Sequence, residues 1–199
     1  MSLTNDFEKM NNALYAILFP HHPYGTQTTI GTQQHLKNPS LRNVMQYYRE
    51  WYVPNNVAIC MSGDLDPDET VRIIEKYFGD WQPSDSLPKR IFPQEKPLEA
   101  PVSVDVVGME TPMVALGWRL PAKADPQYGI MSVVQQILTN GKCGLFDENL
   151  NNAQQVMQAM TFLDGMTDQS AFWAIGCPKE GQSLEEVRDL MLSQVRLLA

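Results

Sequence analysis

The amino-acid sequence predicts an α+β protein with antiparallel sheets and helices packed on one face. Segments with apolar residues at helical spacing, such as Phe7, Met10 and Leu14, are interspersed with short apolar runs typical of strands. In the second half of the chain the expected elements follow the order β-β-α-α-β-β-α. Strands and helices that come in pairs favour an antiparallel layer over a doubly wound parallel sheet.

Composition predicts a folded chain made of two modest units. The chain has 199 residues, of which 43% are hydrophobic and 19% are charged. A chain of this size buries about 70% of its unfolded surface. The net charge of −8 is spread without a basic stretch, which excludes generic binding to nucleic acid or to an anionic membrane surface. The sequence contains no run of about 18 apolar residues, so it predicts no membrane-spanning helix.

The first residues do not have the charged and apolar regions of a secretory signal. A helical pattern begins at Thr4, and we expect the natural amino terminus to lie further upstream. An export signal would belong to that upstream part, so the sequence makes no prediction of the compartment.

Apolar periodicity predicts three helices in the first part of the chain, over residues 5–18, 41–51 and 67–78. The third has the clearest start, because Asp66 is a capping residue, Pro67 fits the first turn and Glu69 is placed to bond back to the cap. Residues 55–64, NNVAICMSGD, are too short for a helix and are flanked by turn residues. We expect a buried strand there.

A proline-rich stretch separates two predicted domains. Residues 82–101 carry five prolines in twenty positions, which is too many for a regular element and stiffens an extended linker. We therefore place the first domain at residues 1–81 and the second at residues 102–199. In the second domain, strands are expected over 102–108, 112–118, 156–163 and 170–176, and helices over 127–138, from 144, and after a capping box at 183–186.

Adjacent histidines, His21 and His22, open the sequence HHPYGTQTTIG and raise the question of a zinc site. Neighbouring residues cannot both aim at one ion without unusual geometry, and no cysteine or carboxylate lies at a zinc-binding spacing from them. We therefore expect a loop imidazole that bonds to the backbone or stacks on Tyr24. His35, in a polar loop, is expected to be solvated or to cap a helix.

The sequence indicates no catalytic nucleophile. A serine triad has all its residue types here, but no G-x-S-x-G sequence would hold the serine exposed. Cys143 has a neighbouring lysine that could activate a thiol, although a small residue at a helix start is the favoured interpretation. Cys60, Cys143 and Cys177 are odd in number and far apart, which predicts neither a disulfide framework nor a metal knuckle.

Three closely spaced acids, Asp64, Asp66 and Asp68, resemble the opening of a calcium loop. Pro67 interrupts that loop, and its glycine and distal glutamate are missing. Capping of the following helix explains these acids instead.

Five sequence features occur in a recognisable order: HPYG, IGT, a helix ending in WYVPNN, the run VAICMSGDLDP, and a helix ending in KYFGDW. In this order the chain resembles the carboxyl-terminal part of the catalytic domain of pitrilysin/insulinase-type zinc peptidases, which are related to the mitochondrial processing peptidase. The stretch from Tyr52 to Asp64 is the most specific. Residues 125–150 resemble the passage into the second, repeated domain, so the resemblance covers residues 5–199.

The resemblance implies the metallohydrolase fold of LuxS and the processing peptidases, with parts of two repeated domains. It also implies zinc in the parent protein, held by H-x-x-E-H and a later glutamate, where metal-activated water hydrolyses peptides. H-x-x-E-H is absent here, and in the family these ligands precede the HPYG loop. Asp6 and Glu8 are the only acids ahead of this loop, so we expect the ligands to lie before Thr4.

In the family, the helix equivalent to the metal-binding one would fall near Gln127 to Leu138, which contains no histidine and no acid. The second domain is therefore expected to be the inactive repeat, contributing packing and one wall of the substrate chamber.

We expect no catalytic, metal-binding or cofactor-binding residue in this chain, and an inactive fragment of a zinc metalloendopeptidase. The expected partners are peptide or unfolded protein substrates of the parent, and homologous domains of the same chain or of a dimer partner. One alternative is a non-catalytic scaffold or core subunit whose metal motif has decayed. Another is the later, inactive half of a four-domain member.

Overall fold

A computed structural model describes residues 5–27 and 30–198 and divides them into two compact units. Unit 1 comprises residues 5–27 and 93–198, and unit 2 comprises residues 30–92. No helix within these ranges is long and apolar enough to cross a bilayer.

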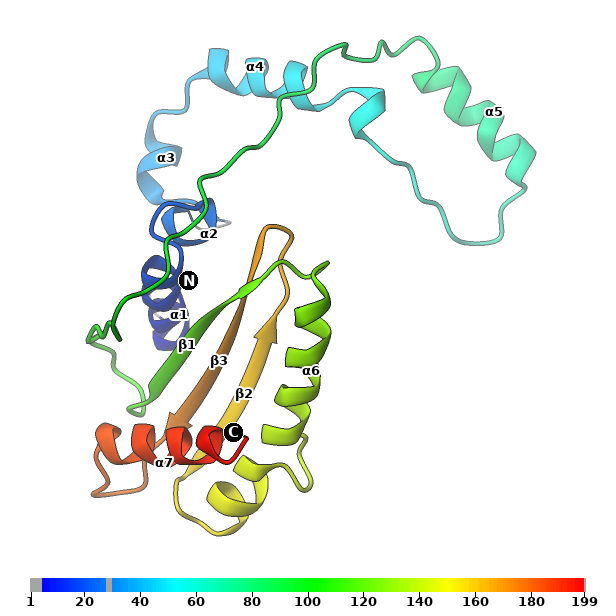
Figure 1. Ribbon diagram of the computed structural model, residues 1–199. Helices are drawn as coiled ribbons and strands as arrows, with labels where there is room; N and C mark the ends of the chain where they lie inside the picture. Colours follow the sequence, from blue (N-terminus) through cyan, green and yellow to red (C-terminus); the bar gives the residue numbers. More distant parts are fainter. Residues whose placement is uncertain (1–4, 28–29, 199) are drawn as a thin grey trace. The chain divides into compact units, whose positions relative to one another are not determined.

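Unit 1 is built on a three-stranded antiparallel sheet with the order β1-β3-β2 (Figure 1). Its strands are β1 (Val114–Pro121), β2 (Gln158–Asp164) and β3 (Gln169–Cys177). Trp173, in the central strand, is paired with Gly117 on one side and with Phe162 on the other. The antiparallel α+β class predicted from the sequence is therefore confirmed.

Helices α6 (Pro126–Leu138) and α7 (Leu184–Arg196) pack on one face of this sheet. Helix α6 begins one residue before the predicted start and is capped by Asp125, and Ser183 and Glu186 form the two bonds of the predicted capping box in α7. The main core lies between these helices and alternate side chains of the strands. Its fully buried members include Leu138, Phe146, Leu150, Ala174, Val187 and Met191.

Helix α1 (Asp6–Leu18) packs on the opposite face of the sheet, where it contacts β1. The smaller core there consists of Tyr15, Leu18, Phe19 and Ala171. Gly117 permits the close approach, because a Cβ atom at this position would collide with the side chains of Leu14 and Leu18. The amino-terminal segment is thus an integral part of unit 1.

Unit 2 contains α3 (Gln33–Lys37), α4 (Leu41–Trp51), the short η2 (Pro54–Asn56) and α5 (Pro67–Phe78). The caps follow the sequence, with Ser40 accepting from Asn43 in α4 and Asp66 accepting from Glu69 in α5. The two asparagines of YVPNN also have defined roles. Asn55 exchanges two hydrogen bonds with Ser84, and Asn56 donates to the Trp51 carbonyl at the end of α4.

Two predicted strands are wrong. Residues 57–62 and 102–108 form no strand, and their large apolar side chains are exposed. The apolar faces of α4 and α5 are also largely exposed, since neither helix has a buried residue. The segment expected to start a helix at residue 144 forms the π-helical turn η3 (Asp147–Asn152). The loop that begins at His21, expected to be irregular, contains the short helix α2 (Pro23–Thr26).

The proline-rich stretch, residues 82–101, has no helix or strand, as its composition predicts. The compact units are nevertheless divided differently from the predicted domains, because residues 5–27 pack with the second half of the chain. The assignment of residues 1–81 and 102–199 to two domains of a longer protein stays a prediction.

Candidate functional site

The histidine loop, which we define as residues 21–27, is a polar segment that contacts the core of unit 1. It follows α1 directly and folds back as α2. His22 is the N-cap of α2 and Pro23 occupies its first turn, where a missing N–H costs nothing. The sequence HPYG therefore encodes a helix start rather than a metal motif.

His22 is 1% exposed, and its ring has partners at both nitrogens. Its Nδ1 accepts a hydrogen bond from the backbone N–H of Tyr24 at 3.2 Å, and its Nε2 lies 3.5 Å from the Asp168 carboxylate. The ring also lies against Tyr24, with the centroids 4.1 Å apart and the ring planes tilted by 54°. Of the two alternatives expected for this loop, the bond to the backbone is confirmed for His22, whose ring contacts Tyr24 at a tilt and is not stacked on it.

Tyr24 and Tyr15 connect the same region to the turn between β2 and β3. The Tyr24 hydroxyl donates to Asp168 Oδ2 at 3.3 Å and accepts from the Asp168 backbone N–H at 3.2 Å. The Tyr15 hydroxyl donates to Asp164. Burial, and then the neighbouring Asp164 carboxylate, raise the pKa of Tyr15. Both acids of the turn thus receive phenolic hydroxyls.

Gly25 completes the loop by lying directly against the end of α1. A Cβ atom there would collide with the carbonyl oxygens of Tyr15 and Phe19. Only glycine permits this approach, so the last position of HPYG is also explained by packing.

His21, in contrast, reaches the proline-rich stretch. Its backbone N–H donates to Glu95 at 2.7 Å and its Nδ1 lies 3.0 Å from the same carboxylate. The Glu95 side chain is only 2% exposed. Burial raises the pKa of Glu95, but the hydrogen bonds from His21 outweigh burial, and the pKa lies below the usual range. The adjacent histidines therefore hold two different segments of unit 1.

The third histidine, His35, serves unit 2. Its Nδ1 accepts from the Thr32 backbone N–H at 3.3 Å, which forms part of a capping box at the start of α3. The predicted capping role is confirmed.

Zinc would require three correctly aimed donors. In the described parts of the chain, no three His, Cys, Asp or Glu side chains gather closely enough to hold a metal ion. His21 and His22 face separate carboxylates. The described residues do not fit a zinc centre, and we assign no step of metal chemistry to them.

The other sequence candidates have structural roles where the contacts define them. Cys143 is exposed, and its Sγ lies 3.9 Å from the side-chain amide of Asn140, which is no base. Asp66 caps α5. Asp6, ahead of the histidine loop, accepts from the Glu110 backbone N–H at 2.6 Å and from Lys9 at 2.9 Å. It ties α1 to the segment before β1.

Sequence reasoning missed Asp147, the best-connected buried acid in the second half. Its carboxylate accepts backbone N–H groups of Asn140 and Gly141 at 2.9 Å and of Gly144 at 3.1 Å. An acid three residues after a glycine-rich turn, as in NGKCGLFD, is the signal that could have found it.

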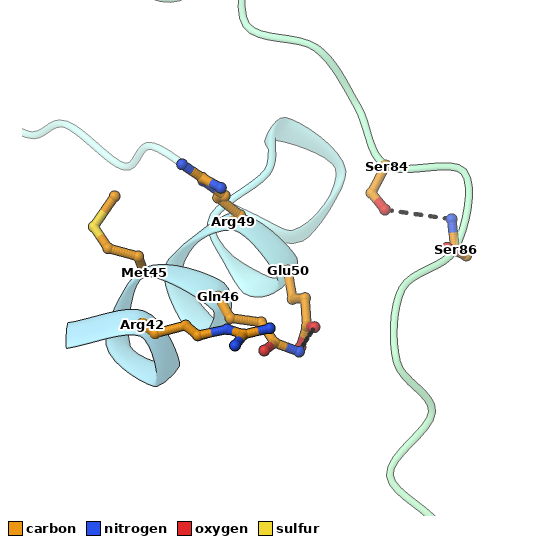
Figure 2. Close-up of a pocket in the computed structure, with 7 residues that line it drawn as sticks. All are labelled: Arg42, Met45, Gln46, Arg49, Glu50, Ser84 and Ser86. Atoms are coloured by element: carbon orange, nitrogen blue, oxygen red, sulfur yellow. Dashed lines mark hydrogen bonds between the residues drawn. The ribbon is translucent and has the colours of Figure 1, made fainter. Parts of the chain in front are cut away.

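A hollow in unit 2 is lined by α4 and by residues 84–86 (Figure 2). Arg42, Gln46 and Glu50 lie together there, whereas Arg49 points away from them. The Gln46 amide already donates to Glu50 at 2.8 Å. The side chains from α4 are exposed, so the hollow has no buried polar group that would define a binding site.

The fold defines a class, namely an α+β domain with helices on both faces of an antiparallel sheet. Comparison with known families gives the particular one. The model of the peptidase M16 inactive domain matches residues 40–199, and the chain belongs to this family.

Individual relatives agree with this membership. The chain is 23% identical to "Zinc protease PqqE" of Helicobacter pylori, over 77% of this chain and 35% of that protein. It is 30% identical to "Probable mitochondrial-processing peptidase subunit beta" of Schizosaccharomyces pombe, over 36% of this chain and 15% of that protein. The resemblance to pitrilysin/insulinase-type peptidases is thereby confirmed.

Among solved structures, a protease from Helicobacter pylori matches with a TM-score of 0.72 at 20% identity, over 96% of this chain and 49% of that one. This likeness shows the shared fold. The chain spans about a third of the length of PqqE and about half of the solved protease.

Proposed function

We propose that this chain is part of a zinc metalloendopeptidase whose metal ligands come from outside residues 5–27 and 30–198, and that it is inactive by itself. One combined observation carries the proposal. The chain belongs to a peptidase family by its inactive domain, while His21 and His22 face Glu95 and Asp168 instead of a shared metal position.

The proposal includes the predicted domains. Residues 1–81 would form the carboxyl-terminal part of the catalytic domain, and residues 102–199 would form the amino-terminal part of the inactive repeat. Residues 82–101 would be the linker between them. Helix α6 supports this assignment, because it has neither histidine nor acid and packs through Met131, Val134 and Leu138 into the core. A helix of this composition can contribute packing and a chamber wall but no ligand.

The proposed substrates are peptides or unfolded proteins of the parent, and the proposed partners are homologous domains of the same chain or of a dimer partner. The names of the H. pylori and S. pombe relatives support the reaction class. The relatives are two or more times longer than the part of them that this chain matches. This extra length supports further domains in the parent protein.

The first test uses the 199-residue chain alone. We expect far less than one zinc per chain by elemental analysis, and no cleavage of a fluorogenic peptide library with or without added Zn²⁺. Stoichiometric zinc together with chelator-sensitive cleavage that Glu95→Gln or His22→Gln abolishes would refute the proposal.

The second test separates the peptidase from the scaffold alternative. The whole gene product containing this chain should bind about one zinc and lose peptide hydrolysis on chelation, as a single open zinc site requires. A whole product that folds but neither binds zinc nor cleaves peptides would favour the scaffold or core-subunit function.

A further inference from the structure

The turn between β2 and β3 receives polar contacts from one remote segment. Two acids, Asp164 and Asp168, frame it, and between them Met166 packs against the small core on the α1 face of the sheet. Tyr15 bonds to the first acid, and Tyr24 and His22 approach the second. All three side chains come from the segment of residues 5–27, which is remote in sequence from the strands that it contacts.

The turn is also held by hydrogen bonds with residues outside the segment 5–27. The Lys123 backbone N–H donates to the Met166 carbonyl at 2.9 Å, and the Met166 N–H donates to Ser170 Oγ at 3.3 Å. The carboxylates are therefore presented from a braced hairpin, which makes the turn suitable as a docking point for a second segment.

The state of His22 follows from its neighbours. Because Nδ1 accepts the Tyr24 backbone N–H, the ring proton belongs on Nε2, which faces Asp168. Tyr24 contributes both a donor and an acceptor to the same residue. Three polar groups of the loop thus converge on Asp168, whose side chain is still half exposed.

We propose that the histidine loop is a docking element, with His22 and Tyr24 as positioning residues that hold the amino-terminal segment on the β2–β3 turn by recognising Asp168. The consequence for catalysis rests on the proposed function. In the parent peptidase, these contacts would fix whatever precedes α1 relative to the inactive repeat. The docking itself requires no peptidase activity.

The test measures hydrogen exchange by mass spectrometry in the 199-residue chain. Tyr24→Phe keeps the ring that contacts His22 but removes the hydroxyl, and Asp168→Asn keeps the shape of the side chain but removes its charge. Each should speed exchange roughly fivefold in peptides covering residues 15–27 and 164–170, the factor expected when one net hydrogen bond is lost. The double variant should exchange faster than the wild-type chain by less than the two single effects combined, because both changes weaken the contact between the Tyr24 hydroxyl and the Asp168 carboxylate, while the other bonds of each residue differ.

Matched controls use exposed residues of the same types. Tyr77→Phe in α5 and Asp105→Asn before β1 should leave exchange in residues 15–27 unchanged. Exchange in α7 should also be unchanged in every variant. The proposal is overturned if exchange in residues 15–27 does not change, if the two single effects add, or if α7 loosens equally, because a general loss of stability would then be the cause.

A spectroscopic test avoids substitution altogether. In ¹⁵N NMR of the unaltered chain, His22 should show an unprotonated Nδ1 and a protonated Nε2, and equimolar Zn²⁺ should not shift either signal. The opposite tautomer, or a zinc-induced shift at His22, would overturn the docking assignment. Neither readout depends on peptidase activity, so this proposal and the proposed function can fail separately.

Discussion

At the scale of single residues, Asp147 shows how one carboxylate organises a turn. It is nearly buried and accepts three backbone N–H groups of the turn before η3. Asp147→Ala should destabilise unit 1 by about 1–3 kcal/mol, because buried donors are left without acceptors. The lower Tm would be measured by calorimetry or circular dichroism.

The neighbouring acid provides the control for this prediction. Glu148 is exposed, and its carboxylate accepts only a 3.3 Å bond from Asn152. Glu148→Ala should change the free energy of unfolding by less than about 0.5 kcal/mol. Equal losses in the two variants would contradict a specific role of Asp147.

Tyr15 leads to a prediction at alkaline pH. Its folded-state pKa is raised by burial and by Asp164, so between the unfolded value of about 10 and the folded value the folded chain holds a proton that the unfolded chain releases. Its contribution to stability is complete below pH about 10 and is lost as pH rises above it. Tyr15→Phe should therefore flatten the alkaline fall in stability, measured by urea unfolding.

Asp164→Asn should flatten this fall partly, because it removes the smaller cause of the raised pKa. If Tyr15→Phe loses stability above pH 10 as steeply as the unaltered chain, Tyr15 is not the responsible group.

Local residue roles could be predicted from sequence, and remote ones could not. The caps at Asp66 and Ser183 lie within three residues of their partners, so spacing alone reveals them. Asp168 is 144 residues from Tyr24, and no spacing rule connects them. The role of His22 was predicted only as far as its local backbone contact, and the contact of His21 with Glu95 was not predicted.

At the scale of elements, helices could be predicted better than strands for a physical reason. A helix bonds within itself, so α1, α4, α5, α6 and α7 follow from periodicity and caps. A strand needs a hydrogen-bonded neighbour. Residues 57–62 and 102–108 have strand-like sequences, but no neighbouring strand pairs with them among the described residues.

Unit 2 should consequently bind apolar dyes. Val57, Ile59 and Met61 are 40%, 47% and 56% exposed, and the apolar faces of α4 and α5 add to this surface. The chain should enhance the fluorescence of anilinonaphthalene sulfonate in its folded state. Ile59→Thr combined with Met61→Thr should reduce the enhancement without lowering the Tm of unit 1.

A polar substitution in the core of unit 1 supplies the comparison. Val187→Thr, at a fully buried position of α7, should lower the Tm of unit 1 by burying a hydroxyl. If Ile59→Thr combined with Met61→Thr leaves dye binding unchanged, the apolar surface of unit 2 is covered in solution.

At the scale of the whole molecule, the class of fold was predictable and the division into units was not. The paired order of elements predicted the antiparallel sheet, which the strand register confirms. The division depends on α1, whose Leu14 and Leu18 pack where Gly117 leaves space. A glycine in a strand does not identify the helix that covers it, so only the three-dimensional arrangement places residues 5–27 with the sheet.

Two acids that join remote parts of unit 1 predict how it responds to low pH. The pKa of Asp6 is lowered chiefly by the hydrogen bond from Lys9 and by backbone N–H groups before β1, and the pKa of Glu95 is lowered by His21 against the opposing effect of burial. A lowered folded-state pKa means that the unfolded chain binds more protons as pH falls. The contribution of both acids is therefore complete above their unfolded pKa values of about 4 and is lost as pH falls through the lower folded pKa values.

The free energy of unfolding of unit 1 should decline in that range, measured by urea unfolding between pH 3 and 6. Asp6→Asn combined with Glu95→Gln should lower stability at pH 7 and flatten the acid branch, whereas Asp105→Asn should change neither. An acid branch equally steep in the double variant would assign acid unfolding to other carboxylates.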